Sequence, residues 1–232
     1  MIKQSVLFGT KKIEYGVKFA NRKTLGITVT PELEVLVKAP PDAKLDKVKE
    51  KVHKKAAWIM KQQNFFLTFH PKTPPRKFIG GETHLYLGRQ YRLKLFKSRK
   101  NFVKLKGRYI EVHCSDSTKI KPLVKEWYLE HARIKFESYA QSWVEKFNGY
   151  GVSPSGLVMR EMPKRWGSCT PRGKIILNPE LIKAPKGCIE YVIVHELCHL
   201  IHHDHTKQFV DLQTKVMPKW EKWKERLEKV MA

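Results

Sequence analysis

The segment HELCHLIHHDH, residues 195–205, holds five of the ten histidines of this 232-residue chain. His195 and His199 are four positions apart, so on a helix both imidazoles lie on one face and can reach one ion. Glu196 follows the first histidine, where it can take a proton from a water that the ion activates. This spacing is the HExxH pattern of zinc metallopeptidases. It predicts a Zn²⁺ site with His195 and His199 as metal ligands and Glu196 as the catalytic residue.

A catalytic zinc ion usually has three protein ligands and keeps a fourth position for water. His202, His203 and His205 compete for the third place. On a straight helix, His202 and His203 would lie about 10–12 Å along the axis from His195. A residue just beyond the helix end can fold back instead, and Asp204 can adopt the turn conformation that ends the helix. We therefore predict His205 as the third ligand, with His202 and His203 at the surface or supporting the site.

The residues around the motif predict a helix that is buried on nearly all sides, because most of residues 191–200 are apolar. Two histidines and a glutamate inside such a helix cost folding free energy unless they bind a partner. The alternative is that they are hydrogen-bonded core residues. Thiolate ligands from Cys169 or Cys198 are a further alternative, which would favour a structural metal site. Cys198 points away from the histidine face, and this argues against it as a ligand.

Three segments together carry a resemblance to a known family: HELCH followed by His205, RWGSC at 165–169 and ILNPEL at 176–181. They resemble the YgjP-like family of metal-dependent hydrolases, which are minimal zincins similar to the SprT and WLM groups of metallopeptidases. The resemblance extends over about residues 22–226 and is most specific in 160–210. It implies three histidine ligands and a glutamate general base. The third ligand has the spacing found in metzincins, but the glycine that metzincins place after the second histidine is absent.

Zincins commonly present a sheet edge beside the metal, and an extended peptide pairs with it. Residues 164–178 are predicted to be extended and can supply this edge. The substrate-binding residues expected here are Arg165, Trp166, Ser168 and Asn178. Arg165 can bind a substrate carboxylate or phosphate, or stabilise an oxyanion. The alternatives are packing and turn formation for Trp166 and Ser168, and capping of a turn for Asn178.

The chain is strongly basic, with 46 lysines and arginines against 22 aspartates and glutamates and a net charge of +24. Residues 1–115 hold 26 of the basic and 8 of the acidic residues, so the positive field belongs mostly to the front half. Such a field attracts phosphate-bearing partners. A lysine-rich surface that only keeps the protein soluble is the alternative.

The run RQYRLKLFKSRKNFVKLKGR, residues 89–108, contains nine basic residues and no acidic one. Tyr91, Phe96 and Phe102 are interleaved with the charges. Lysines on a strand face can follow a phosphate backbone while aromatic rings stack on bases, so this run is a candidate nucleic-acid interface. The alternative is that the aromatic residues face the core, which the shared face of Tyr91, Leu93 and Leu95 favours.

The fold class expected from these patterns is α+β. Residues 1–115 are predicted as a β-rich part with strands near 13–19, 24–38, 91–95 and 109–114, and with one helix over 42–66 capped by Asp42. Residues 116–232 are predicted as a zincin-like part whose helices cover 118–147, the HExxH motif from Pro185, and a stretch after Thr206 that Pro218 can kink. Residues 70–81 have the proline and glycine content of a linker. One YgjP-like domain over about 22–226 is the alternative division.

The favoured interpretation is a cytoplasmic zinc metallopeptidase that acts on a peptide or protein. The first alternative is a metal-dependent phosphohydrolase, a pyrophosphatase of nucleoside triphosphates held by lysine and arginine. The second is a nucleic-acid-binding protein with structural zinc. No apolar run approaches the length of a membrane span, and the first residues lack the apolar stretch of a signal peptide. We therefore expect no membrane partner and a reducing cytosol without disulfides.

Overall fold

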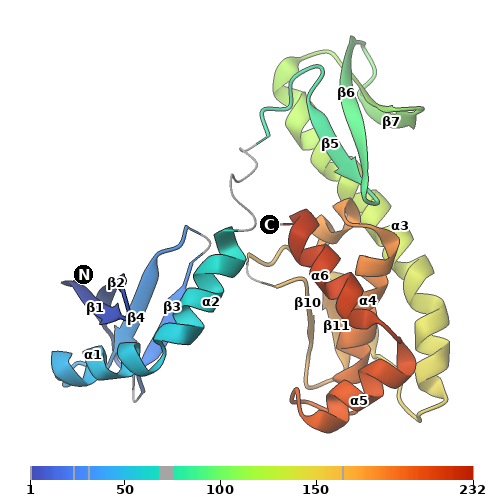
Figure 1. Cartoon of the computed structure of the whole chain (residues 1–232). Helices are drawn as coiled ribbons and strands as arrows, with labels where there is room; N and C mark the ends of the chain where they lie inside the picture. Colours follow the sequence, from blue (N-terminus) through green and yellow to red (C-terminus); the bar gives the residue numbers. More distant parts are fainter. Residues whose placement is uncertain (1, 23, 31, 68–75, 164, 232) are drawn as a thin grey trace. The chain divides into compact units, whose positions relative to one another are not determined.

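The computed structural model describes residues 2–22, 24–30, 32–67, 76–163 and 165–231 (Figure 1). The chain forms two compact units, Met1–Thr73 and Pro74–Ala232, and each combines helices with β-sheet. The division falls inside the predicted linker 70–81, of which residues 70–75 lie outside the described part. It lies before residue 83 and not at the end of the β-rich part expected over 1–115, because the strands over 83–114 share a hydrophobic core with the helices that follow them.

The first unit is a four-stranded sheet with two helices. The sheet has the order β1-β2-β4-β3, with β2 and β4 parallel and the other pairs antiparallel. The predicted strand near 13–19 and the predicted hairpin over 24–38 are confirmed. Alternate residues of β2 and β4 pack with buried residues of the helices; on the strands these are Ile13, Tyr15, Val17, Val35 and Val37, and on the helices Val48, Val52 and Ile59. The elements are β1 (Ile2–Phe8), β2 (Lys11–Phe19), β3 (Gly26–Val29), β4 (Val35–Ala39), α1 (Leu45–Lys54) and α2 (Ala56–Leu67).

The single helix predicted over 42–66 is wrong in two respects. It is two helices, α1 and α2, separated at Lys55. The apolar positions Val48, Val52 and Ile59 keep helical spacing across this break, so periodicity alone does not reveal it. Asp42 is not the N-cap either: α1 begins at Leu45 after Lys44, and no side chain caps it.

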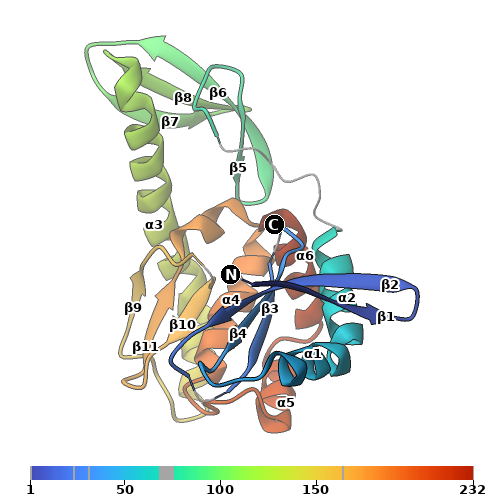
Figure 2. The ribbon, with the colours of Figure 1, turned by 90° about the vertical axis from the view of Figure 1, so that its left-hand side faces the viewer.

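The second unit contains two sheets joined by a long helix, α3 (Figures 1 and 2). One sheet has the order β5-β6-β8-β7, and the other has the order β10-β11-β9. The predicted strands near 91–95 and 109–114 are confirmed as β6 and β8. The elements are β5 (Thr83–Tyr86), β6 (Arg89–Lys97), β7 (Phe102–Lys106), β8 (Tyr109–Cys114), η1 (Ser117–Lys119), α3 (Ile120–Asn148), β9 (Gly156–Met159), β10 (Gly167–Cys169), β11 (Lys174–Leu177) and η2 (Pro179–Lys183).

Helix α3 packs against the four-stranded sheet with its first turns and against the helix that carries HExxH farther along. One hydrophobic core therefore extends through the unit (Figure 1). The turn after β5 also hydrogen bonds to η2, with the N–H of Leu87 donating to the carbonyl of Ile182 at 2.8 Å. These contacts explain why the sheet belongs to the second unit. Among the helices of the described residues, none is long and apolar enough to cross a membrane.

The remaining helices are α4 (Lys186–Cys198), α5 (Lys207–Val216) and α6 (Trp220–Met231). Helix α4 is the predicted core helix and packs against α3, α5, α6, β10 and β11. The kinked helix predicted after Thr206 is two helices, because Pro218 cannot continue the hydrogen-bond ladder and Lys219 adopts a left-handed φ of 64°. Thr206 caps α5 by accepting a hydrogen bond from the N–H of Phe209.

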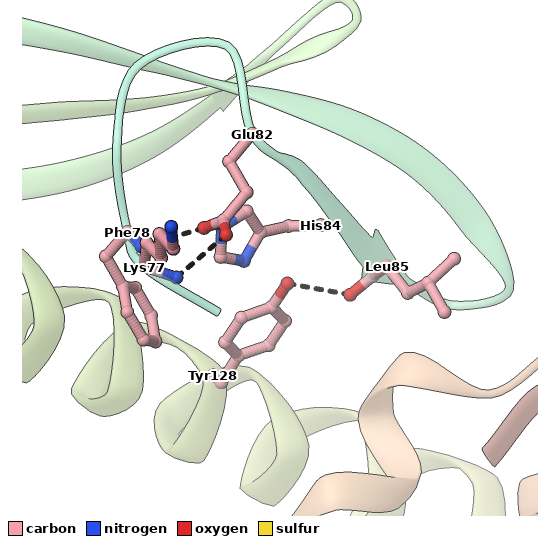
Figure 3. Close-up of polar contacts among 6 residues, drawn as sticks. All are labelled: Lys77, Phe78, Glu82, His84, Leu85 and Tyr128. Atoms are coloured by element: carbon pink, nitrogen blue, oxygen red, sulfur yellow. Dashed lines mark hydrogen bonds and ion pairs between the residues drawn. The ribbon is translucent and has the colours of Figure 1, made fainter. Parts of the chain in front are cut away.

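A hydrogen-bonded cluster around Glu82 fixes the start of the second unit on α3 (Figure 3). Glu82 accepts hydrogen bonds from the backbone N–H groups of residues 77–78, each at 2.8 Å. The ring of His84 lies 2.9 Å from the same carboxylate. The hydroxyl of Tyr128 on α3 donates to the carbonyl of Leu85 at 2.7 Å. The first strand of the sheet is therefore attached both to the preceding turn and to the long helix.

Candidate active site

Three histidines converge at the end of α4. His195 lies in the last turn of the helix, and His199 is its C-terminal cap. The chain then turns back before α5, so that Nε2 of His205 lies 3.0 Å from Nε2 of His195. One ligand nitrogen from each of the three residues lies within 4.8 Å of the others. The structure thus brings together the three side chains predicted as metal ligands.

The other two histidines of the segment occupy different places. The carbonyl of His202 accepts a hydrogen bond from Nδ1 of His199 at 3.1 Å, so this residue orients the cluster through its backbone. His203 is exposed and borders the same cavity, outside the group of three. This distribution agrees with the expectation that His202 and His203 lie at the surface or support the site.

The donor set fits a metal ion. Nδ1 of His195 donates to the side-chain oxygen of Gln213 on α5 at 3.0 Å, and Nδ1 of His199 donates to a backbone carbonyl. Hydrogen bonds of this kind leave the Nε2 lone pairs free for a metal and fix the rings, as is usual around zinc. With Zn–N distances of about 2.0–2.1 Å, two nitrogens on a tetrahedral ion lie about 3.3 Å apart. The 3.0 Å between His195 and His205 is close to that separation.

Burial favours the neutral form of two of the clustered imidazoles, those of His195 and His199. It lowers the pKa of His195 to about 4, although the hydrogen bond to Gln213 offsets part of this effect. Burial also lowers the pKa of His199, and its backbone hydrogen bond at His202 opposes the shift. Neutral imidazole is the form that binds a metal, so these two predicted ligands are in the required form at neutral pH.

Glu196 is held by strand β10. It is only 5% exposed, and burial raises the pKa of its carboxyl to about 7. The backbone N–H of Cys169 donates to this carboxylate, and Arg165 lies near enough to attract it; both lower the pKa against the effect of burial. Gly167 makes the close approach of the strand possible, because a Cβ there would lie 2.5 Å from the Oε1 atom of Glu196.

A cavity of about 850 Å³ opens over the histidines and the glutamate. Strand β10 and the residues around it form its wall opposite α4, and three of the four predicted substrate-binding residues border it: Arg165, Trp166 and Ser168. Tyr191 of α4 borders it as well, one turn before His195. A cavity of this size accommodates a peptide segment beside the metal cluster.

Asn178, the fourth predicted substrate-binding residue, is buried and is not among the residues that border the cavity. Its amide nitrogen donates to the carbonyls of Met162 at 2.8 Å and Arg165 at 3.1 Å. Its side-chain oxygen accepts from the N–H of Glu180 at the start of η2. Asn178 caps a turn, as the alternative proposed, and it also fastens the segment that leads into β10.

The sequence patterns missed two residues of the site, Gln213 and Gly167. Gln213 is a polar residue only 1% exposed, one position after Leu212 on the apolar side of α5. A buried polar residue in an otherwise apolar stripe could have marked it. Gly167 lies within the RWGSC segment, but nothing in the sequence indicates which side chain approaches its backbone.

Comparison with protein families identifies the class of this protein. Residues 23–230 match the family described as YgjP-like, metallopeptidase domain, and so include both the histidine cluster and most of the first unit. The chain therefore belongs to the YgjP-like family and is a metal-dependent hydrolase. Comparisons with curated proteins and with solved structures find no match.

Proposed function

We propose that this protein is a zinc-dependent metallopeptidase with His195, His199 and His205 as ligands and Glu196 as the general base. The observation that carries the proposal is that Glu196, held against strand β10, borders the same cavity as the three-histidine cluster. When bound, zinc polarises the scissile carbonyl and lowers the pKa of the attacking water. Three protein ligands are the number that catalytic zinc sites use, whereas structural sites use four.

Glu196 supplies the proton transfers. Its carboxylate takes a proton from the attacking water and then passes it to the nitrogen of the leaving amine. A pKa raised by burial suits both steps, because the group accepts and releases a proton near neutral pH. The N–H of Cys169 holds the carboxylate in one orientation during this exchange.

Strand β10 offers the substrate a backbone edge. Backbone hydrogen bonds join β11 to Trp166 and Thr170, which lie two positions before and two positions after Ser168. In an antiparallel pair the backbone N–H and C=O groups of the intervening residues, Gly167 and Cys169, therefore point away from β11. In the described part of the chain, no strand pairs with this outer side of β10. An extended peptide can add there as a further strand, which would bring its carbonyl beside the metal cluster.

The composition of the cavity favours a peptide over a nucleoside triphosphate. Among the described residues that border it, Arg165 is the one with a permanent positive charge. A triphosphate carries several negative charges and is usually held by several cations. One arginine instead suits a single carboxylate or the oxyanion of a peptide substrate.

The test compares zinc-loaded wild type with Glu196→Gln on labelled casein peptides and on nucleoside triphosphates. Glu190→Gln, on the same helix but outside the cavity, is the matched control. We expect Glu196→Gln to keep its zinc and to lose peptidase activity by on the order of a hundredfold or more, with Glu190→Gln unaffected. Hydrolysis of triphosphates but not peptides would replace the proposal with the phosphohydrolase. Equal activity in Glu196→Gln and wild type would show that this site does not carry out the hydrolysis.

A further inference from the structure

Strands β6, β8 and β7 of the four-stranded sheet form an outward face on the side opposite the core. Its cross-strand register arranges nine side chains in three rows. Residues of the other parity, such as Leu93, Ile110 and Val112, are buried in the core. From one end of the sheet to the other, the rows are Arg92–Tyr109–Lys106, Lys94–Glu111–Lys104 and Phe96–His113–Phe102.

This arrangement differs from the interpretation in which the aromatic residues of 89–108 all face the core. Tyr91 does pack against the core, together with Leu95. Phe96 and Phe102, in contrast, lie on the charged face with Lys94. The reason is the two-residue period of a strand, which gives Phe96 the same side as Arg92 and Lys94. The face therefore mixes aromatic rings with cations.

The aromatic row is a continuous stack. The ring centroids of Phe96 and His113 are 4.7 Å apart with planes 10° from parallel, and those of His113 and Phe102 are 4.3 Å apart with planes 8° from parallel. Phe102, on the outer strand β7, is 40% exposed. A nucleobase can extend the stack at this exposed edge position.

Cations lie over the exposed rings. The amine of Lys94 is 5.1 Å from the centroid of Phe96 and 5.4 Å from that of Tyr109, which is 42% exposed. The amine of Lys104 is 5.8 Å from the centroid of Phe102. A phosphate bound by either lysine would therefore place its attached nucleotide beside an aromatic ring.

Glu111 is the one carboxylate among the nine residues, and it does not oppose an anionic ligand. It is 7% exposed and lies beneath its neighbours. The amine of Lys104 is 3.4 Å from its carboxylate, and Nε2 of His113 is 3.7 Å away. Its carboxylate is covered and paired with Lys104, whereas Arg92, Lys94 and Lys106 remain exposed.

We propose that this face binds single-stranded nucleic acid, with phosphates on Arg92, Lys94, Lys104 and Lys106 and bases stacked on Phe102 and Tyr109. Positive charge alone would suit any polyanion, but exposed rings between the cations favour a ligand with accessible base planes. A duplex hides these planes within its stack, so the single strand is the better fit. This inference concerns a surface outside the candidate active site and does not depend on the proposed peptidase activity.

The test measures binding of short fluorescent single-stranded RNA and DNA, and of a duplex of the same sequence, by fluorescence anisotropy over a series of salt concentrations. Phe102→Leu and Tyr109→Leu remove stacking without changing charge. Each should weaken single-strand binding by on the order of tenfold, with a smaller effect on the duplex. Lys94→Gln with Lys106→Gln should lower the slope of log affinity against log salt by about 1.4, because each phosphate on a single strand contributes about 0.7.

Matched controls come from other exposed positions. Trp58→Leu removes a ring that is 41% exposed on α2, and Lys121→Gln with Lys125→Gln removes two exposed charges from α3. Both controls should bind like wild type. Because the lysine variants alter only exposed side chains, they test the proposal even where an aromatic variant fails to fold.

The proposal is overturned if the duplex binds as tightly as the single strand, or if both sets of sheet variants bind like wild type. It is also overturned if the control variants lose as much affinity as the sheet variants. Preferential binding of anionic phospholipid vesicles or of polyglutamate, measured in the same assay by competition, would assign the face to a membrane or to an acidic protein instead.

Discussion

The side-chain oxygen of Gln213 lies 3.0 Å from Nδ1 of His195 and so links the buried side of α5 to the face of α4 that carries two of the predicted metal ligands. The hydrogen bond places the proton of His195 on Nδ1 and leaves Nε2 as the metal donor. Gln213 is almost completely buried, so its oxygen has no solvent to replace this contact. Gln213, which is not a predicted ligand, thereby determines how one predicted ligand is oriented.

Gln213→Ala should therefore weaken metal binding by roughly 10- to 100-fold, the usual effect of removing a partner of a ligating histidine. Competition with a chromophoric chelator measures the affinity. Gln213→Glu keeps an acceptor at this position and should retain most of the affinity. Gln141→Ala, an exposed glutamine on α3, is the control. Affinity equal to wild type in Gln213→Ala would show that packing alone orients His195.

Gly167→Ala should impair catalysis while metal binding persists. The added methyl group would lie 2.5 Å from Oε1 of Glu196, so the strand or the carboxylate must move. Displacement of a catalytic group by about 1 Å can cost on the order of a hundredfold in rate. Peptidase rates and metal content of the same preparation test this expectation. Gly80→Ala is the control, since its nearest neighbour would be 4.0 Å away; an equal loss in both variants would contradict the steric explanation.

The histidine cluster predicts about one metal ion per chain, because it supplies the three ligands of one catalytic-type site. His195→Ala, His199→Ala and His205→Ala should each lose most of the bound metal in elemental analysis after dialysis. His203 borders the cavity but lies outside the cluster, so His203→Ala should keep the metal. If His205→Ala retains the metal and His203→Ala loses it, the third ligand has been assigned to the wrong residue.

The hydrogen-bonded pair of Glu82 and His84 should make stability decrease in acid. Burial lowers the pKa of His84, Glu82 opposes the shift, and the charges of Arg76 and Lys183 add to it. Burial alone would raise the pKa of Glu82, but hydrogen bonds from residues 77–78 and His84 outweigh it and lower the pKa. Both groups therefore bind fewer protons in the folded state than in the unfolded state. The free energy of unfolding should fall as the pH drops below about 6.5 for the histidine, and further below about 4.5 for the glutamate.

Urea unfolding of the metal-free protein at pH 7, 6 and 5 measures this effect. His84→Gln should lose less stability than wild type between pH 7 and pH 5, because the titrating group is gone. The active-site histidines are present in both proteins, so their contribution cancels in the comparison. Parallel stability curves for the two proteins would mean that His84 does not contribute to the pH dependence.

The sequence by itself determined the features that depend on local backbone geometry. Helical spacing put His195 and His199 on one face with Glu196 beside them, and the two-residue period of β6 separated Leu93 from Lys94. Turn residues marked the hairpin of β3 and β4. These patterns are visible because the backbone of a helix or strand fixes side-chain direction within a few residues.

The tertiary structure decided what those faces meet. Gln213 lies 18 positions from His195, and Gly167 lies 29 positions from Glu196, so no local periodicity relates them. The break between α1 and α2 at Lys55 also came from the tertiary structure, since the apolar spacing continues through it. Packing likewise decided that β5–β8 belong to the second unit, which the strand pattern along the chain does not reveal. Whether a polar group is buried, and which partner satisfies it, depends on elements brought together by the whole core, and that information is spread along the chain.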